Sequence, residues 1–173
     1  DPVITLAAAN STVECDGSGN VAALNAWLAS NGGATATDAC GPLTWTNDFT
    51  ALSDLCAATG AATVTFTVTD GSGNFATTSA TFTIEDTTAP SIDEEAADVT
   101  MPCGANDILQ VLDGWIENNG FAEATDLCGP VTWSNDYVGL SDLCGATGAA
   151  TVTFTATDVC GNESTTTATF TTR

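Results

Sequence analysis

Basic side chains are almost absent from this sequence. Of its 173 residues, one is Lys or Arg, none is His and 22 are Asp or Glu, which gives a net charge of −21 at pH 7. Proteins that bind nucleic acids use cationic side chains to displace the counterions of the phosphates, and anionic membranes attract the same side chains. The composition therefore argues against nucleic-acid partners and against direct membrane insertion. It also predicts an acidic surface that attracts cations.

The lack of His also removes most of the usual catalytic chemistry. General bases, phosphate clamps and oxyanion-stabilising groups are commonly built from His, Lys and Arg. Zinc sites commonly use His or paired CxxC cysteines, and neither occurs here. A pair of carboxylates, as in glycosidases, is the route that stays open. We expect a protein that is not an enzyme, and we assign no catalytic residue.

The sequence has no apolar run of 18 residues and no secretory signal sequence, so we expect the mature interior of a longer protein. Its seven cysteines suggest disulfides and an oxidising, extracellular location. Small domains bury a limited share of their surface on folding, and covalent crosslinks compensate for this. We therefore expect most of these cysteines to be paired.

The chain consists of two tandem copies of one sequence unit. A shift of 88 residues lays the sequence on itself without a gap, and 46 of the 85 overlapping positions are identical. Cys15 then falls on Cys103, Trp27 on Trp115, Cys40 on Cys128, Trp45 on Trp133, Cys56 on Cys144 and Phe66 on Phe154. Repeats of this kind usually belong to long arrays. We expect two tandem domains, residues 1–86 and residues 87–173, joined at an acidic hinge that ends in Pro90.

Most of each copy has the alternating pattern of a strand with one buried face. In residues 63–70 and 77–86 apolar side chains alternate with polar ones, mostly Thr, and the sequence DGSGN between these runs predicts a hairpin. The second copy repeats this pattern around DVCGN. The side chains expected to face the core are Val64, Phe66, Val68, Ala80, Phe82, Ile84, Val152, Phe154, Ala156, Ala168 and Phe170, with Leu43, Trp45, Val131 and Trp133 upstream.

One segment of each copy has helical spacing instead. In residues 106–120 the apolar side chains recur at three- and four-residue intervals, with Asp107 as the N-cap and Gly120 past the end. The first copy has residues 20–33 in the same place. The apolar stripes predicted to pack on the sheet are Val21, Leu24, Trp27 and Leu28, and Ile108, Val111, Leu112, Trp115 and Ile116.

Several motifs resemble a known family. The series APSI, TATD.CGN and TATF resembles the immunoglobulin-like HYR repeat, and DTTAP, ALNAWLASNGGATATDACG, TWTNDF and ATVTFTATD.CGN are similar to repeats in very large surface proteins of Bacteroidota. Those proteins are adhesins and filaments that are typically exported by the type IX route. The resemblance implies a mainly β fold of two tandem immunoglobulin-like β-sandwich domains, each with one short inserted α-helix.

The topology of that family implies a disulfide pattern. It places Cys128 and Cys160 at the pole where the second domain begins, and Cys103 and Cys144 at the opposite pole. We expect these two pairs to form disulfides, and Cys15 to pair with Cys56 in the first copy. Ser72 stands where the second copy has Cys160, which leaves Cys40 unpaired. A local Cys40–Cys56 bridge with Cys15 unpaired is the alternative, because spacing alone does not decide connectivity.

The same topology implies a metal site at the hinge. Glu85 and Asp86 leave the first domain, and the near pole of the second domain offers Asp126, Asp158 and Asn162. Carboxylate and amide oxygens that converge in this way suit Ca²⁺. The alternative is that Asp158 and Asn162 only cap their hairpin. DGSGN lacks the spacing and the closing Glu of an EF-hand loop.

Two further expectations follow from the resemblance. The sequence DTT at residues 86–88 looks like the O-glycosylation signal of Bacteroidota, which makes Thr87 a candidate. The repeated, acidic and disulfide-rich sequence favours a stalk or filament segment on the bacterial cell surface. Its partners are neighbouring repeats of the same long chain, and bundling into a homo-oligomeric fibre is a further expectation. A carbohydrate- or cell-binding adhesin module is the alternative.

Overall fold

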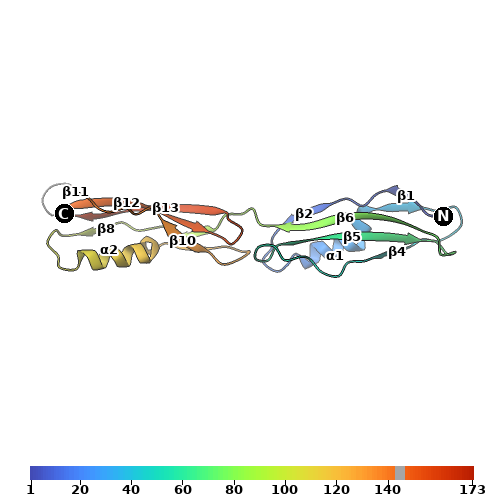
Figure 1. Cartoon of the computed structure of the whole chain (residues 1–173), viewed down its shortest axis with the longest axis horizontal. Coiled ribbons are helices and arrows are strands. Elements are labelled where there is room, and N and C mark those ends of the chain that lie inside the picture. Colours follow the sequence, from blue (N-terminus) through green and yellow to red (C-terminus); the bar gives the residue numbers. More distant parts are fainter. Residues whose placement is uncertain (143–146) are drawn as a thin grey trace. The chain divides into compact units, whose positions relative to one another are not determined.

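A computed structural model describes residues 1–142 and 147–173 of the chain. Contacts within it divide the chain into two compact units, unit 1 from Asp1 to Asp86 and unit 2 from Thr87 to Arg173. Figure 1 labels both α-helices and most of the strands. Both α-helices are short, and no helix in the described part of the chain has the length and apolar character needed to cross a membrane.

Unit 1 consists of one larger mixed sheet, one smaller antiparallel sheet and one α-helix. Its elements are β1 (Val3–Leu6), β2 (Ser11–Glu14), α1 (Val21–Ala29), a 3-10 turn (Asn31–Gly33), β3 (Thr35–Thr37), β4 (Thr44–Asn47), β5 (Gly60–Thr69) and β6 (Phe75–Glu85). The larger sheet has the order β2-β6-β5-β4, in which β2 runs parallel to β6 and the other pairs are antiparallel. Strands β1 and β3 form the smaller sheet.

Unit 2 repeats this arrangement. Its elements are β7 (Ser91–Glu94), β8 (Val99–Met101), α2 (Ile108–Glu117), a 3-10 turn (Asn119–Phe121), β9 (Glu123–Thr125), β10 (Thr132–Asn135), β11 (Ser141–Asp142), β12 (Gly148–Thr157) and β13 (Glu163–Thr172). The larger sheet has the order β8-β13-β12-β10, with β11 also paired to β12, and β7 pairs with β9. The expected hairpins are β5–β6 and β12–β13 (Figure 1).

The core of each unit lies on one face of the long hairpin. The apolar side chains predicted to face inward on these strands are buried: Val64, Phe66, Val68, Ala80, Phe82, Ile84, Val152, Phe154, Ala156, Ala168 and Phe170. Successive side chains of a strand point to opposite faces, so the period-two pattern decided which of them are buried. The prediction of a mainly β fold with two tandem β-sandwich domains, each with one short helix, is confirmed.

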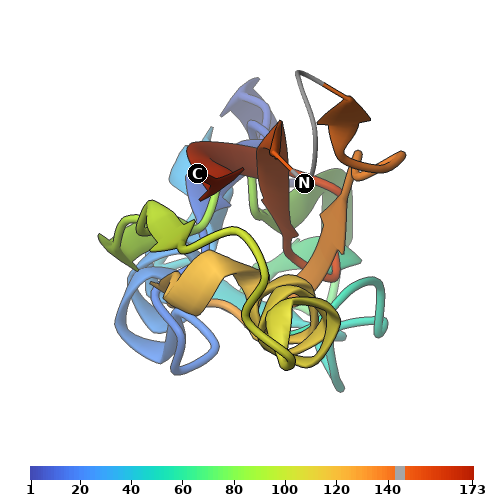
Figure 2. The ribbon, with the colours of Figure 1, turned by 90° about the vertical axis from the view of Figure 1, so that its left-hand side faces the viewer.

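Each helix covers the apolar face of its sheet through one tryptophan. Trp115 is fully buried, and its ring meets Phe154 edge-on at a centroid distance of 5.3 Å. Trp27 meets Phe66 in the same way at 5.2 Å. The indole N–H donates to a backbone carbonyl in both units, to Ala9 from Trp27 and to Ala97 from Trp115. Figure 2 shows α2 lying against one face of the β12–β13 pair.

Two details of the predicted helices differ in the structure. Val21 is 59% exposed, because the short α1 turns only Leu24 and Trp27 fully into the core. Asp107 occupies the N-cap position of α2, but its side chain makes no capping hydrogen bond. Gly120 does follow α2, and it lies within a short 3-10 turn with a left-handed φ of 66°.

That glycine is needed for packing as well as for its conformation. A Cβ at Gly120 would lie 2.7 Å from Cε2 of Phe154, and one at Gly32 would lie 3.1 Å from Cε2 of Phe66. Both distances are shorter than ordinary van der Waals contact. The turn after each helix therefore rests directly on the phenylalanine that its tryptophan contacts, and a larger residue there would force the turn or the ring to shift.

The outer face of each long hairpin carries hydroxyl groups in place of charges. Thr63 and Thr81 face each other across β5 and β6, and their Oγ1 atoms are 2.8 Å apart. Thr151 and Thr169 form the equivalent pair in unit 2, at 3.0 Å. Cross-strand pairs of this kind stabilise the sheet locally, and the period of two places them opposite the core.

Candidate cation-binding loops

Two aspartates of unit 1 organise the loops at one end of its sheet. Asp38 follows β3, and its Oδ1 accepts a hydrogen bond from the backbone N–H of Cys40 at 2.7 Å. Asp70 follows the strand β5, and its Oδ1 accepts from the N–H groups of Ser72 and Asn74 at 2.8 and 2.9 Å. The Nδ2 of Asn74 donates to Asp70 Oδ2 at 2.8 Å. We call Asp38 and Asp70 the acidic pair of unit 1.

Unit 2 contains the same loops 88 residues later. Asp126 Oδ1 accepts from the N–H of Cys128 at 2.7 Å, and Asp158 Oδ1 accepts from Cys160 and Asn162 at 2.8 and 2.9 Å. Asn162 Nδ2 donates to Asp158 Oδ2 at 2.8 Å. Asp126 and Asp158 are the acidic pair of unit 2. Asp158 and Asn162 therefore cap their hairpin, as one alternative had it.

The ammonium of Asp1 contacts both carboxylates of unit 1. The ammonium nitrogen of Asp1 is 3.0 Å from Asp38 Oδ2 and 3.8 Å from Asp70 Oδ2. The two carboxylate side chains are only 2% and 9% exposed. This ion pair was not predicted from the sequence. The signal was present, because Asp38 and Asp70 are the repeat equivalents of Asp126 and Asp158.

Hydrogen bonds keep these carboxylates ionised. The N–H of Cys40, followed by the ammonium of Asp1, lowers the pKa of Asp38, and the Asn74 side chain is the main group that lowers the pKa of Asp70. Burial raises the pKa of Asp158, but hydrogen bonds from Asn162, Cys160 and Gly161 outweigh it and leave that pKa lowered. All three side chains are therefore anionic at neutral pH and available to a cation.

The hinge residues belong to different units. Glu85 and Asp86 end unit 1, whereas Asp126, Asp158 and Asn162 belong to unit 2, so their convergence stays a prediction. Glu85 is exposed, and its backbone carbonyl accepts from Cys15 N–H at 2.8 Å. Asp86 is 8% exposed. A carboxylate buried to this extent requires hydrogen bonds or a cation to keep its charge.

Four cysteines of the described residues are disulfide-bonded: Cys15, Cys56, Cys128 and Cys160. Cys40 is an exposed free thiol, as predicted, and the alternative bridge between Cys40 and Cys56 is wrong. Cys103 is also an exposed free thiol, so the prediction that it is disulfide-bonded is wrong; the partner predicted for it, Cys144, lies outside the described residues.

The placement of the bonded cysteines supports the predicted pairing. Cys15 contacts the end of β6 through Glu85, and Cys56 contacts Thr59, the residue before β5 begins. Because β5 and β6 are antiparallel, both cysteines lie at the same end of the sheet. The pairs Cys15–Cys56 and Cys128–Cys160 themselves stay predictions, as does glycosylation of Thr87, which is exposed.

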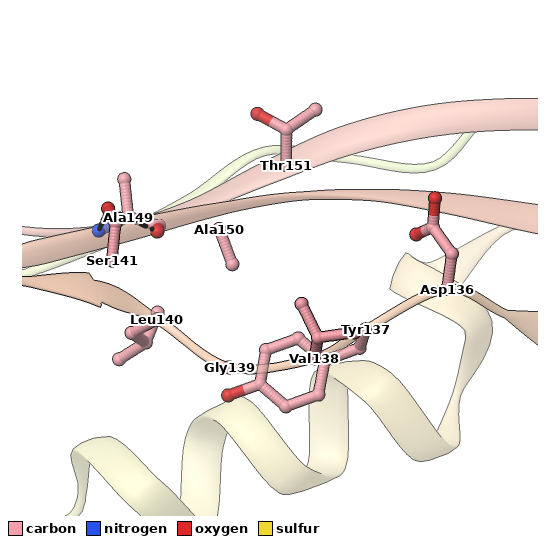
Figure 3. A pocket seen from close by; sticks show the side chains of 9 residues that line it. All are labelled: Asp136, Tyr137, Val138, Gly139, Leu140, Ser141, Ala149, Ala150 and Thr151. Atoms are coloured by element: carbon pink, nitrogen blue, oxygen red, sulfur yellow. Dashed lines mark hydrogen bonds between the residues drawn. The ribbon is translucent and has the colours of Figure 1, made fainter.

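A second candidate site is a cavity of about 560 Å³ in unit 2. Figure 3 shows the loop that carries Asp136 and Tyr137 on one side of it and Ala149–Thr151 of β12 on the other. Asp136 Oδ1 accepts from the backbone N–H of Thr153 at 2.8 Å, which lowers the pKa of Asp136 and fixes the loop to the strand. Asp48 binds Thr65 in the same way in unit 1, so this acid has a structural role.

Comparisons with known proteins give a general likeness of shape only. No protein-family model and no curated protein matches the sequence. A crystal structure of Drosophila N-cadherin EC1-4 is 11% identical with a TM-score of 0.35, and the match covers 99% of this chain and 49% of that one. A chimeric titin Z1Z2-Z1Z2 tandem is 14% identical with a TM-score of 0.30 over both whole chains.

Human protocadherin-24 EC1-2 is a further solved structure of this kind. It is 13% identical with a TM-score of 0.31, and the match covers 80% of this chain and 85% of that one. The chain spans about half the length of the N-cadherin structure named above. Identities this low say nothing about what the chain binds.

Proposed function

We propose that the two units are one segment of a long extracellular rod on a bacterial surface, a stalk or filament that carries no catalytic site. The rod would hold an adhesive or motile device away from the cell. Contacts along exposed sheet edges would allow such chains to bundle into a homo-oligomeric fibre. The net charge of −21 opposes bundling unless cations screen it.

One observation carries this proposal: the second unit copies the first down to single hydrogen bonds. The Trp–carbonyl bond, the threonine pair across the hairpin and the Asp–Asn bonds of the hairpin loop all recur 88 residues later. A binding or catalytic role needs one site and leaves the copies free to diverge elsewhere. The length that a stalk spans depends on the number of copies, so a stalk function favours copies that each keep the whole fold.

Deleting one 88-residue copy from the full-length gene tests the proposal directly. We expect the surface structure, imaged by electron microscopy, to shorten while attachment to its ligand is unchanged. A control deletion of the same length elsewhere in the chain separates shortening from failed export. If the deletion removes ligand binding at unchanged length, the stalk proposal is wrong.

We also propose that Ca²⁺ stiffens the joint between units, bound by Glu85, Asp86, Asp126, Asp158 and Asn162. The donor set suits a hard cation, because carboxylate and amide oxygens are what Ca²⁺ prefers and no His is present. The burial of Asp86 and Asp158 supports the proposal, since a cation offsets the cost of burying charge. When bound, Ca²⁺ would supply charge compensation and rigidity, not chemistry.

Chelation should then lower the melting temperature of the chain. At a hundredfold excess of Ca²⁺ over its dissociation constant we expect a gain of about 2.7 kcal/mol in unfolding free energy, which EDTA removes. Asp158→Asn should abolish this response. Asp70→Asn is the matched control, because it loses the same hairpin bonds in unit 1 and should keep the response. Identical melting curves with and without EDTA would rule out the joint site.

A carbohydrate-binding module is the second candidate, and the Tyr137 cavity favours it. Tyr137 is the only tyrosine of the chain and is partly buried beside a cavity large enough for a sugar. Aromatic rings combined with hydrogen-bonding groups are common in small-ligand sites. The copy deletion above decides between the two candidates, since loss of unit 2 would remove this site.

A further inference from the structure

The cavity beside Tyr137 exists because the loop between β10 and β11 is fastened to β12 at its two ends only. At one end Asp136 Oδ1 accepts from the N–H of Thr153 at 2.8 Å, and the N–H of Asp136 donates to the Thr153 carbonyl at 3.3 Å. At the other end Ser141 bonds to the backbone of Ala149. Residues 136–141 therefore span the shorter stretch 149–153, and the loop bulges away from the strand over the cavity (Figure 3). We call residues 136–141 the arch.

The arch leaves one backbone amide and one carbonyl of β12 facing the cavity. In an antiparallel strand the N–H and C=O groups of every second residue point to the same side. Ala149 and Thr153 direct theirs to the arch, so Thr151, which lies between them, does the same. Neither group of Thr151 forms a hydrogen bond with a described residue of the arch. A donor and an acceptor thus lie side by side at the cavity, on a rigid strand.

Ser141 shows which chemical group fits a donor and acceptor placed in this way. Its one hydroxyl accepts from the N–H of Ala149 at 3.3 Å and donates to the carbonyl of the same residue at 2.8 Å. A hydroxyl can do both because it has one donor hydrogen and two acceptor lone pairs, whereas a carboxylate only accepts and an ammonium only donates. A hydroxyl of a ligand can therefore bind Thr151 in the way that Ser141 binds Ala149, two residues away on the same edge.

The rest of the lining favours a ligand without negative charge. The Asp136 carboxylate lies at the cavity, and none of the described lining residues is basic. An anionic ligand would meet like charge there, which is costly. Tyr137 and Leu140 are partly buried beside the cavity and supply apolar surface. Apolar walls with a few fixed polar groups are typical of small-molecule sites.

We infer that a neutral saccharide binds under the arch, with one of its hydroxyls hydrogen-bonded to both the N–H and the C=O of Thr151. The inference rests on the carbohydrate-binding candidate proposed above, and it adds the contact that orients the sugar and the exclusion of acidic sugars. One ring makes few contacts, so we expect a dissociation constant on the order of 10⁻³ M.

Titration of the 173-residue chain with simple sugars, followed by NMR, tests the inference. The probes are glucose, galactose and mannose, with glucuronate as the charged analogue of glucose. The Thr151 amide is the reporter, and the amide of Thr63, the equivalent residue of unit 1, is compared with it. We expect a saturable shift of the Thr151 amide with at least one neutral hexose, and binding weaker by about tenfold or more with glucuronate, because it carries the charge of a carboxylate.

Ala150→Val is the variant that tests the location of the site. Figure 3 shows the methyl group of Ala150 pointing from β12 toward the loop, so two further methyl groups there would occupy part of the cavity. We expect the hexose affinity to fall by about tenfold or more, since the ring loses contacts in the cavity. Ala62→Val is the matched control, because it makes the same change at the equivalent position of unit 1 and should leave binding in unit 2 unchanged.

Two results would overturn the inference: a Thr151 amide that none of the three hexoses shifts, or equal affinity for glucose and glucuronate. If a hexose shifts only amides far from the arch, carbohydrate binding stands and the site under the arch is wrong. If no amide of the chain shifts, the carbohydrate-binding candidate fails as well. Should Ala150→Val not fold, the comparison of neutral and acidic sugars in the unchanged chain still decides.

Discussion

Replacing Trp115 by Ala is expected to destabilise unit 2 by about 3–5 kcal/mol, the range for a large buried aromatic side chain. Trp115 is fully buried, it packs against Phe154 and Phe170, and its indole N–H donates to the Ala97 carbonyl at 2.8 Å. Truncation therefore leaves a cavity between helix and sheet, and it also removes the donor to the Ala97 carbonyl. Calorimetry should show the loss as a fall of well over 10 °C in the melting temperature of unit 2.

Leu109→Ala provides the control within the same helix. Leu109 is 69% exposed, so its truncation should change stability by less than about 0.5 kcal/mol. Trp27→Ala should produce a comparable loss in unit 1, where Trp27 is 9% exposed and its bond to Ala9 is 3.1 Å long. If Trp115→Ala and Leu109→Ala have the same effect, the tryptophan is not the central contact of the core.

The long hairpins were the part of the fold that the sequence predicted best. Phe66 in β5 and Phe154 in β12 each alternate with threonines along their strand. In each strand only one register buries the ring together with its apolar neighbours. The 88-residue repeat then doubled each piece of information, because every inference about one unit could be checked in the other. Strand and helix type were therefore predictable from local pattern alone.

The short sheets could not be predicted in this way. Strands β1 and β3 have four and three residues and pair across about 30 residues of chain, including a helix. Such strands are too short to show a period, and their pairing is decided by tertiary packing. The prediction that Val21 packs on the sheet was wrong for a similar reason, since a helix of nine residues buries only the side chains nearest the sheet.

The candidate site was predictable in its residue types but not in its contacts. Asp126, Asp158 and Asn162 were proposed as cation ligands because the topology of the family that the sequence resembles places them at the pole of unit 2 near the hinge, and this stays a prediction. The carboxylate-to-ammonium contact of Asp38 joins residues 37 positions apart, and nothing local to either residue marks it. Contacts of this kind follow from which loops the sheet brings to one end, which is a property of the fold.

Replacing both Cys128 and Cys160 by Ser is expected to destabilise unit 2 by roughly 3–4 kcal/mol, if these two cysteines form the proposed bridge. In the chain-entropy account a crosslink stabilises by restricting the unfolded chain, and a loop of about 32 residues gives this value. Unit 2 should still fold. In unit 1, Ser72 replaces one of the two cysteines, and the Asp70 hairpin loop keeps the same hydrogen bonds. Urea unfolding of the oxidised protein measures the difference.

The reverse change in unit 1 tests the same geometry by adding a bond. Ser72→Cys places a thiol 32 residues after Cys40, the same separation as between Cys128 and Cys160. Because the backbone N–H of Ser72 already donates to Asp70, and that of Cys40 to Asp38, both positions are held at the acidic pair before any bridge forms. We expect oxidation to join the introduced thiol to Cys40 and to raise the stability of unit 1 by up to the amount that unit 2 loses. Non-reducing peptide mapping identifies the bridge. An unbridged thiol in this variant, or a bond of Cys128 to any cysteine other than Cys160, would show that the two loops do not meet as the repeat requires.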